Sequence, residues 1–199
     1  MIIINKPIII AICGKSASGK NSLASMLKTY LWASCGLNTK SIVSCTTRPA
    51  RVNEWDGQDY HFINTAEFLE YAQKKEFLEY TTFKGWHYGT LKTEINNDFI
   101  NIGIFNPEGL LKLSKYKNDY TIIPIFINAS FLVRIKRSIK REGKWSAEYI
   151  RRAIVDRKDF IRINDYLNMF KFYLKLPRGL STYEEAKKIR RYLEKINVI

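Results

Sequence analysis

The sequence predicts an α/β fold in three layers, with a central parallel sheet between two layers of helices. Strand-like apolar runs alternate with segments of helical apolar spacing along most of the chain. This alternation is typical of parallel sheets with right-handed crossovers. The runs at residues 8–13 and 121–127 are apolar almost throughout, which indicates strands that are buried on both faces. A glycine-rich stretch joins the first run to a helical segment.

Length and composition indicate a globular protein with an anionic partner. The chain of 199 residues is long enough to bury a full core, and we expect a single domain. Hydrophobic residues make up 46% and charged residues 26%, which is ordinary for a globular protein. The net charge of +14 favours a nucleotide, a nucleic acid or a membrane surface as partner, and charge alone does not choose among them.

The cysteines and the N-terminal residues favour a cytoplasmic protein. Three scattered cysteines read as reduced thiols of a cytoplasmic protein. The first apolar residues are interrupted by Lys6 and Pro7, so we expect neither a secretory signal nor a membrane span. The histidines, His61 and His87, show no metal-ligand spacing, and we predict no metal-ligating residues of the protein.

Residues 14–21 read Gly-Lys-Ser-Ala-Ser-Gly-Lys-Asn and follow the first apolar run. Strand, glycine loop and helix are the context that a phosphate-binding P-loop requires. Glycines allow turns in which successive N–H groups converge on a phosphate, and the helix N-terminus contributes its positive dipole end. Lys20 adds a full positive charge. The candidate phosphate-binding residues are Gly14, Ser16, Ala17, Ser18, Gly19, Lys20, Asn21 and Ser22.

The elements follow from apolar spacing and from capping residues. In the first half we expect strands at about 7–13, 41–45, 59–63 and 77–83, and helices at about 20–34 and after Asn64. In the second half we expect helices at about 91–96, 107–116, 131–141 and 146–163, strands at 99–105, 121–127 and 170–174, and a last helix opened by the capping box 181–184.

The region from about residue 48 to residue 90 interrupts the alternation, and we interpret it as an insertion over the carboxyl edge of the sheet, where ligands bind in such folds. Arg48 and Arg51, with Tyr60 and Tyr88, can hold a dianionic phosphate through charge-assisted hydrogen bonds. A strand carboxylate such as Glu79 can accept from the ring N–H and the exocyclic amine of a guanine.

This region resembles guanylate kinase. The run S-x-T-T-R-x-x-R-x-x-E-x-D-G-x-D-Y-x-F occupies residues 44–62, and E-F-L-E at 76–79 and Y-G-T at 88–90 follow in the family's order. The resemblance includes the P-loop, covers about residues 8–90 well and continues more weakly to the end of the chain.

The resemblance implies a role for each matching residue. It assigns the acceptor monophosphate to Arg48, Arg51, Tyr60 and Tyr88, and the guanine to Ser44, Glu79 and Thr90. It also implies a helical lid whose arginines close over the phosphates. Arg134 shares one helical face with two of these arginines. The implied catalytic residues are Lys20, Arg48, Arg137, Arg141 and Arg152.

The resemblance further implies a P-loop kinase fold with an inserted monophosphate-binding (NMP-binding) subdomain. The core then comprises residues 1–45, 91–132 and 165–199, the insert 46–90 and the lid 133–164. The implied reaction transfers the γ-phosphoryl group of ATP, with Mg²⁺, to GMP or dGMP. We expect a monomer or homodimer that binds no membrane and no specific nucleic acid.

Three positions depart from the family pattern. Asn21 stands where a hydroxyl residue binds Mg²⁺, although its amide oxygen could contact the ion. Ile104 and Asn106 stand where an acidic pair is expected at a strand end. Residues 176–179, Leu-Pro-Arg-Gly, replace the Asn-Asp turn on the adenine side, so the sequence does not assign the adenine pocket.

Two alternatives therefore stay open. A ribose 1,5-bisphosphate phosphokinase resembles this family and carries a non-hydroxyl residue after the P-loop lysine, as Asn21 does here. A binding module without turnover is the second alternative, although such modules tend to lose residues equivalent to Lys20, Arg141 and Arg152.

Overall fold

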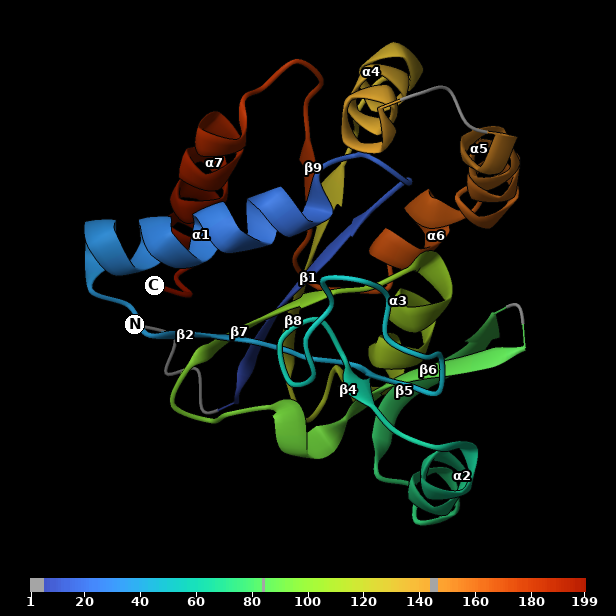
Figure 1. Ribbon diagram of the computed structural model, residues 1–199. Helices are drawn as coiled ribbons and strands as arrows, with labels where there is room; N and C mark the ends of the chain where they lie inside the picture. The colour runs from blue at the N-terminus through green and yellow to red at the C-terminus, as the bar shows by residue number, and fades with distance from the viewer. Residues whose placement is uncertain (1–5, 84, 144–146) are drawn as a thin grey trace.

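The computed structural model describes residues 6–83, 85–143 and 147–199, which form two sheets and the helices around them (Figure 1). The larger sheet has five strands in the order β2-β7-β1-β8-β9, and all neighbouring strands are parallel. This confirms the predicted parallel sheet. Its strands are β1 (Ile8–Gly14), β2 (Thr39–Ser41), β7 (Ile100–Ile104), β8 (Thr121–Ile127) and β9 (Leu174–Leu176).

Helices α1 (Lys20–Cys35) and α7 (Thr182–Lys195) cover one face of this sheet and lie beside each other. Ile10 and Ile12 of β1 share a buried core with Leu27 of α1 and Ile189 of α7. Side chains alternate between the two faces of a strand, so these two isoleucines lie on the same face.

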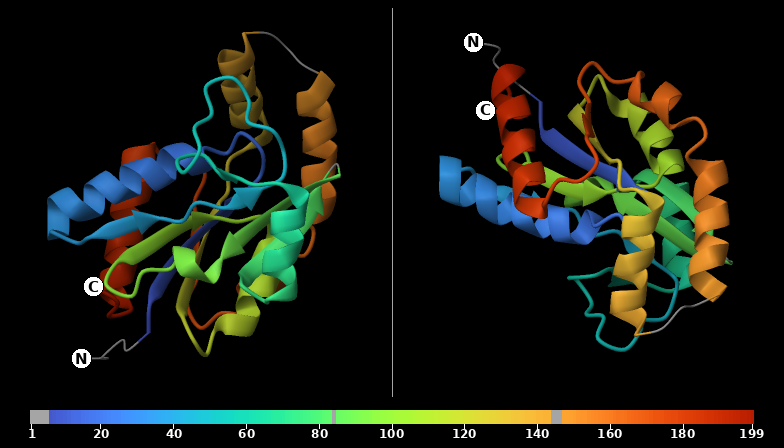
Figure 2. Two further views of the ribbon diagram at one scale, coloured as in Figure 1. Left: turned by 60° about the horizontal axis from the view of Figure 1, so that its bottom comes forward. Right: turned by 90° about the horizontal axis from the view of Figure 1, so that it is seen from above.

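Helices α3 (Pro107–Leu113) and α6 (Ile163–Leu167) cover the opposite face, where Ile9 and Ala11 pack with Leu110 and Leu167. The sheet therefore lies between two helix layers, as the two further views in Figure 2 show. This double burial explains why β1 is apolar at nearly every position.

A second sheet of four strands, in the order β4-β3-β6-β5, is built from the inserted region. Helix α2 (Thr65–Gln73) joins β4 to β5, and its N-cap Asn64 accepts from the Glu67 N–H at 2.9 Å. That cap confirms the predicted helix start. The strands are β3 (Cys45–Thr46), β4 (His61–Phe62), β5 (Phe77–Phe83) and β6 (Trp86–Leu91).

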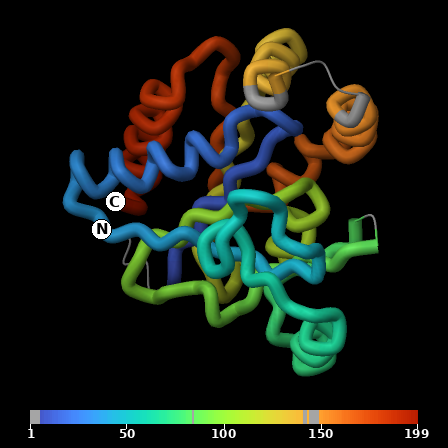
Figure 3. The backbone as a smooth tube through the Cα atoms, viewed as in Figure 1, coloured from blue at the N-terminus to red at the C-terminus, as the bar shows by residue number. Residues whose placement is uncertain are grey.

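Helices α4 (Phe131–Glu142) and α5 (Ala147–Asp159) follow β8, and α2 stands on the opposite side of the molecule in the view of Figure 3. The short 3₁₀ turns η1 (Lys92–Glu94) and η2 (Ser114–Tyr116) complete the described elements. Within the described residues, no helix combines the length and the apolar character that crossing a bilayer requires.

Two predicted elements that flank the inserted region were wrong. The strand expected at 41–45 ends at Ser41, because the Val43 N–H binds the Glu94 carboxylate at 3.2 Å and Cys45 pairs in the second sheet. The helix expected at 91–96 does not form. Leu91 instead ends β6, a strand that was not predicted, by pairing with Phe77.

Two predicted elements near the C-terminus also differ from the structure. The helix expected at 146–163 is interrupted after Asp159, where a turn lets both Phe160 and Ile163 enter the core; residue 146 lies outside the described residues. The strand expected at 170–174 lies at Leu174–Leu176, because Phe170 is buried against the helices of one face.

Candidate active site

The loop between β1 and α1 contains residues with positive φ, at Ala17 (58°) and Gly19 (102°). Glycine adopts such angles at little cost. A Cβ added at Gly19 would lie 2.9 Å from Nη1 of Arg137, and one at Gly14 would lie 2.7 Å from Oγ of Ser18. Close neighbours, including the Ile127 carbonyl at 3.2 Å, therefore favour glycine at position 14, whereas the positive φ favours it at position 19.

Two cations lie against this loop. The Lys20 ammonium folds back and donates to the carbonyls of Gly14 at 2.8 Å and Lys15 at 3.2 Å. Arg137 of α4 donates to the Ser18 carbonyl. The loop thus combines backbone N–H groups, a helix N-terminus and two full positive charges, which together suit a phosphate. Asn21 and Ser22 follow as exposed residues in the first turn of α1.

A chain of hydrogen bonds joins the three residues expected to contact guanine. The Ser44 and Thr90 hydroxyls lie 3.0 Å apart, and the Thr90 hydroxyl donates to Oε1 of Glu79 at 2.8 Å. The chain joins the segment before β3 to the neighbouring strands β5 and β6. One accepting carboxylate beside two hydroxyls matches the edge of a guanine, which carries two donors and one carbonyl.

Glu79 is only 9% exposed. Burial, the largest influence, raises the pKa of Glu79, while the Thr90 hydroxyl and the Lys112 ammonium partly oppose this rise. A buried carboxylate with one fixed hydrogen-bond donor is prepared to accept further hydrogen bonds from a ligand, because these compensate for its lost hydration.

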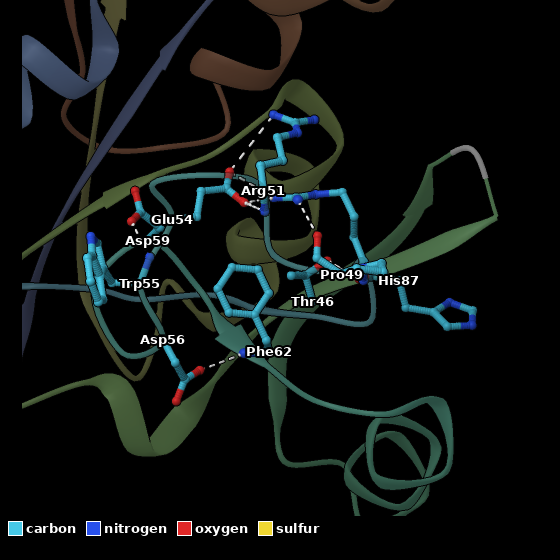
Figure 4. Close-up of polar contacts among 10 residues, drawn as sticks. Thr46, Pro49, Arg51, Glu54, Trp55, Asp56, Asp59, Phe62 and His87 are labelled. Atoms are coloured by element: carbon cyan, nitrogen blue, oxygen red, sulfur yellow. Dashed lines mark hydrogen bonds and ion pairs between the residues drawn. The ribbon is translucent and has the colours of Figure 1, made fainter.

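Arg48 and Arg51 lie together in the loop after β3. The Arg48 guanidinium pairs with the Glu54 carboxylate at 2.9 Å, and Figure 4 shows Glu54 also turned toward Arg51, 3.9 Å away. Burial disfavours the charge of Arg48, but the Glu54 carboxylate and the Tyr88 hydroxyl outweigh it and raise the pKa of Arg48. Arg48 therefore keeps its charge although it is 9% exposed.

Two tyrosines complete this cationic site. The Tyr60 and Tyr88 rings meet edge to face with centroids 6.0 Å apart, and the Arg48 guanidinium lies 5.5 Å from the centre of the Tyr60 ring. The structure thus brings together the four residues expected at the acceptor phosphate. Glu54 acts as their internal counter-ion, and its place in the run at residues 44–62 is the signal that could have pointed to this role.

Helix α5 contributes an unpredicted contact to the P-loop through Asp156. Its carboxylate accepts from the Ser16 N–H at 2.8 Å and the Ser16 hydroxyl at 3.2 Å. The same carboxylate pairs with Arg134 of α4 at 3.1 Å, and Arg134 in turn donates to the Ser16 carbonyl at 3.2 Å. Both side chains are buried, so Arg134 belongs to a buried clasp rather than to a solvated stripe.

The predicted lid arginines have different positions. Arg137 contacts the P-loop, and Arg152 of α5 lines a cavity with Arg48 and Arg51. Arg141 belongs to α4, but its side chain lies outside the described part of the structure. No spacing rule pointed to Asp156, which is one of three acidic residues in the sequence of α5.

Two adjoining cavities connect the P-loop to the inserted sheet. The first, of about 670 Å³, is lined by Lys20 and Glu79, and the second, of about 490 Å³, by Arg51 and Arg152. Ser16, Tyr88, Asn106, Asp156 and Asp159 are among the residues that line both. A molecule in the inserted sheet can therefore reach the P-loop through a continuous space.

The end of β7 supplies no carboxylate to this space. Ile104 is 37% exposed, and Asn106 caps α3 by accepting from the Gly109 N–H at 2.6 Å. Among the described residues, no group of three or more His, Cys, Asp or Glu side chains could hold a metal ion. The cavity that Lys20 lines also contains the carboxylates of Glu79, Glu108, Asp156 and Asp159, and Asn21 follows Lys20 in α1.

A third cavity, of about 590 Å³, opens on the other flank of α4. Its wall combines the residues after β8, the loop between β9 and α7, and the side chains of Arg137 and Glu185. Strands β8 and β9 follow β1 in the sheet order, so this cavity lies beside the P-loop at the carboxyl edge. Ligands bind at that edge in parallel α/β sheets.

The chain is similar in sequence to known guanylate kinases. The guanylate kinase of Wigglesworthia glossinidia brevipalpis is 34% identical over 161 residues, which cover 78% of this chain and 75% of the relative. The guanylate kinase of Mycoplasma mobile is 32% identical over 189 residues, which cover 91% of this chain and 90% of the relative.

Structure and family comparison agree with this similarity. The crystal structure of guanylate kinase from Anaplasma phagocytophilum matches with a TM-score of 0.64 at 21% identity, over 98% of this chain and 88% of that one, and so shares the fold. A family model described as Guanylate kinase matches residues 5–169. The chain belongs to the guanylate kinase family.

Proposed function

We propose that this chain transfers the γ-phosphoryl group of ATP to GMP or dGMP. The observation that carries this proposal is the hydrogen-bonded chain of Ser44, Thr90 and Glu79 in a cavity that reaches Lys20. A sugar phosphate has no base edge for such a chain to read. The family membership supports the same activity.

Charge stabilisation is the main task of the proposed site. Arg48, Arg51, Tyr60 and Tyr88 hold the acceptor phosphate, and Lys20 holds the donor phosphates with the P-loop N–H groups. Arg137, Arg141 and Arg152 approach from the lid and neutralise charge as the phosphoryl group moves. Phosphoryl transfer needs no covalent nucleophile from the protein, so positioning and electrostatics suffice.

Mg²⁺ enters this proposal with ATP rather than as a resident ion. Mg²⁺ prefers oxygen ligands and keeps several waters when phosphates bind it. The oxygens of Asn21 and Asp159 suit that chemistry, and they replace the missing hydroxyl and the missing acidic pair only in part. When bound, the ion neutralises phosphate charge.

We further propose the division into a core (1–45, 91–132 and 165–199), an insert (46–90) and a lid (133–164). The separate second sheet and the position of α4 and α5 at the P-loop support it. The third cavity is then the place of the donor base, because it lies beside the P-loop and across α4 from the acceptor.

A substrate panel tests the proposal. The purified protein receives ATP–Mg²⁺ with GMP, dGMP, AMP, dTMP or ribose 1,5-bisphosphate, and ADP formation is measured, with an EDTA control for the metal. We expect turnover with GMP or dGMP, and none after Lys20→Ala.

Other outcomes separate the alternatives. Turnover of the sugar phosphate alone would establish the phosphokinase. GMP binding without any turnover would establish a binding module.

A further inference from the structure

Glu185 is a buried carboxyl group that has no role in the reaction proposed above. It lies in the first turns of α7, is 7% exposed and lines the third cavity. Among the described residues, no side chain forms a hydrogen bond or an ion pair with its carboxylate. The Glu185 oxygens are not among the fully buried atoms that lack a partner, so they open on the cavity. Their unused hydrogen-bonding capacity in a cavity wall points to a ligand.

We propose that Glu185 recognises the base of the phosphoryl donor and does so in its neutral form. This inference rests on the proposed function, because it takes the third cavity as the donor side. A neutral carboxyl offers one O–H donor and one carbonyl acceptor. Adenine presents the complementary pair, an amine donor beside a ring-nitrogen acceptor, which amide side chains read in the same way.

The protonation state of Glu185 decides which purine fits. An ionised carboxylate has two acceptors and no donor. It therefore repels the lone pair of an adenine ring nitrogen, but it matches the two donors of guanine. Burial raises the pKa of Glu185 to about 7, and the Arg137 guanidinium partly opposes this. Neutral Glu185 therefore persists near neutral pH, and the adenine base stabilises it further.

Other charged groups face the same cavity from each element of its wall. Arg137 comes from α4, Arg178 from the loop before α7, and Glu184 from α7 itself. Glu184 binds the N–H and the hydroxyl of Ser181 within a capping box, both at 2.7 Å. Glu184 is thus committed to the helix start, and Glu185 is the carboxyl group available to a ligand.

The test compares Glu185→Ala, Glu185→Gln and the control Glu194→Gln, an exposed carboxylate on the same helix. KM and kcat for ATP and for GTP as donor are measured from pH 6 to pH 8.5 at saturating GMP. We expect Glu185→Ala to raise the KM for ATP about tenfold, the scale of one two-point base contact, with the KM for GMP unchanged. In the wild-type protein we expect the KM for ATP to rise above pH 7, as Glu185 ionises. Glu185→Gln should keep the low KM for ATP and should not show this rise.

An unchanged KM for ATP in Glu185→Ala would overturn the inference. So would a fall in kcat at constant KM, because that result assigns Glu185 to Arg137 positioning. ATP binding without acceptor, measured by calorimetry on the wild-type protein and Glu185→Ala, tests Glu185 even if no GMP is phosphorylated. A failure of the proposed function can therefore be told apart from a failure of this inference. Thermal unfolding of each variant establishes that it is folded.

Discussion

At the scale of single residues, the proposed site contains two buried carboxyl groups that we expect to bind the two bases. Glu79 and Glu185 are both less than 10% exposed, and burial raises the pKa of each. They differ in what surrounds them. Thr90 donates to Glu79, whereas no described side chain forms a hydrogen bond with Glu185, and the Arg137 charge partly opposes the rise of its pKa. The same side chain can therefore act as an ionised acceptor at one base and as a neutral group at the other.

Replacement of Glu79 by alanine should remove base selectivity. The two guanine donors lose their acceptor, so the preference for GMP over AMP should fall about tenfold to hundredfold, the range of one two-point contact. Steady-state kinetics with both acceptors measure this, and Glu70→Gln on the surface of α2 is the control. An unchanged preference among bases would remove the guanine assignment.

Replacement of Glu185 by glutamine should change how stability depends on pH. The folded-state pKa is raised from 4.5 to about 7, so the unfolded chain releases this proton first as the pH rises. The free energy of unfolding therefore falls between these two values, by on the order of 3 kcal/mol for this group. Urea denaturation at pH 5 and pH 8 should show a smaller loss in Glu185→Gln. An equal loss in both proteins would contradict this.

At the scale of elements, helices α4 and α5 are joined to the P-loop by the clasp of Arg134, Asp156 and Ser16. Arg134 is 5% and Asp156 is 8% exposed. The carboxylate takes an N–H group of the P-loop, a group that a phosphate would otherwise use. The clasp therefore links the position of the lid to the state of the loop.

Asp156→Asn should loosen α5 and destabilise the protein by about 3 kcal/mol, because it leaves the Arg134 charge buried without its counter-ion. Asp165→Asn is the matched control, because its pair with Arg162 is exposed and such pairs contribute about 0.5 kcal/mol. Denaturation measures the difference, and hydrogen exchange reports opening of α5. Equal stability of the two variants would rule out a structural role for the clasp.

At the scale of the whole molecule, the two sheets are joined by packing and by polar links. Leu78 of β5 shares a buried core with Ile9 of β1 and Leu110 of α3. Glu94 is one link, since its carboxylate lies 3.6 Å from the Lys40 ammonium of β2 and 3.2 Å from the His61 ring of β4. In the proposed function the acceptor binds the insert and the donor binds the core, so we expect the two to approach each other during the reaction.

Addition of ATP and GMP together should contract the molecule, as the insert and the lid close and exclude water. Small-angle X-ray scattering measures the radius of gyration of the Lys20→Ala variant with and without both nucleotides, provided that the variant still binds them. The wild-type protein with GMP alone is the comparison. A radius of gyration that is unchanged by either addition would contradict closure.

The sequence predicted much of the molecule because its signals are local or shared with a family. The alternation of residues 8–13 between two cores follows from strand geometry, and the P-loop follows from its glycines and Lys20. The predicted acceptor residues lie in one continuous motif, residues 44–62, and in two short motifs, residues 76–79 and 88–90. Predictions failed at residues 91–96 and 170–174, where tertiary pairing outweighed local propensity.

The sequence by itself determined the parallel sheet, and it predicted the phosphate-binding loop and the acceptor residues, because each is encoded by neighbouring positions or by a family motif. Only the tertiary structure decided the clasp of Asp156 on Ser16, 140 residues away, and the isolation of Glu185 in a cavity wall. Burial and long-range partners decide such roles. Neither quantity is a property of the residues adjacent in the chain.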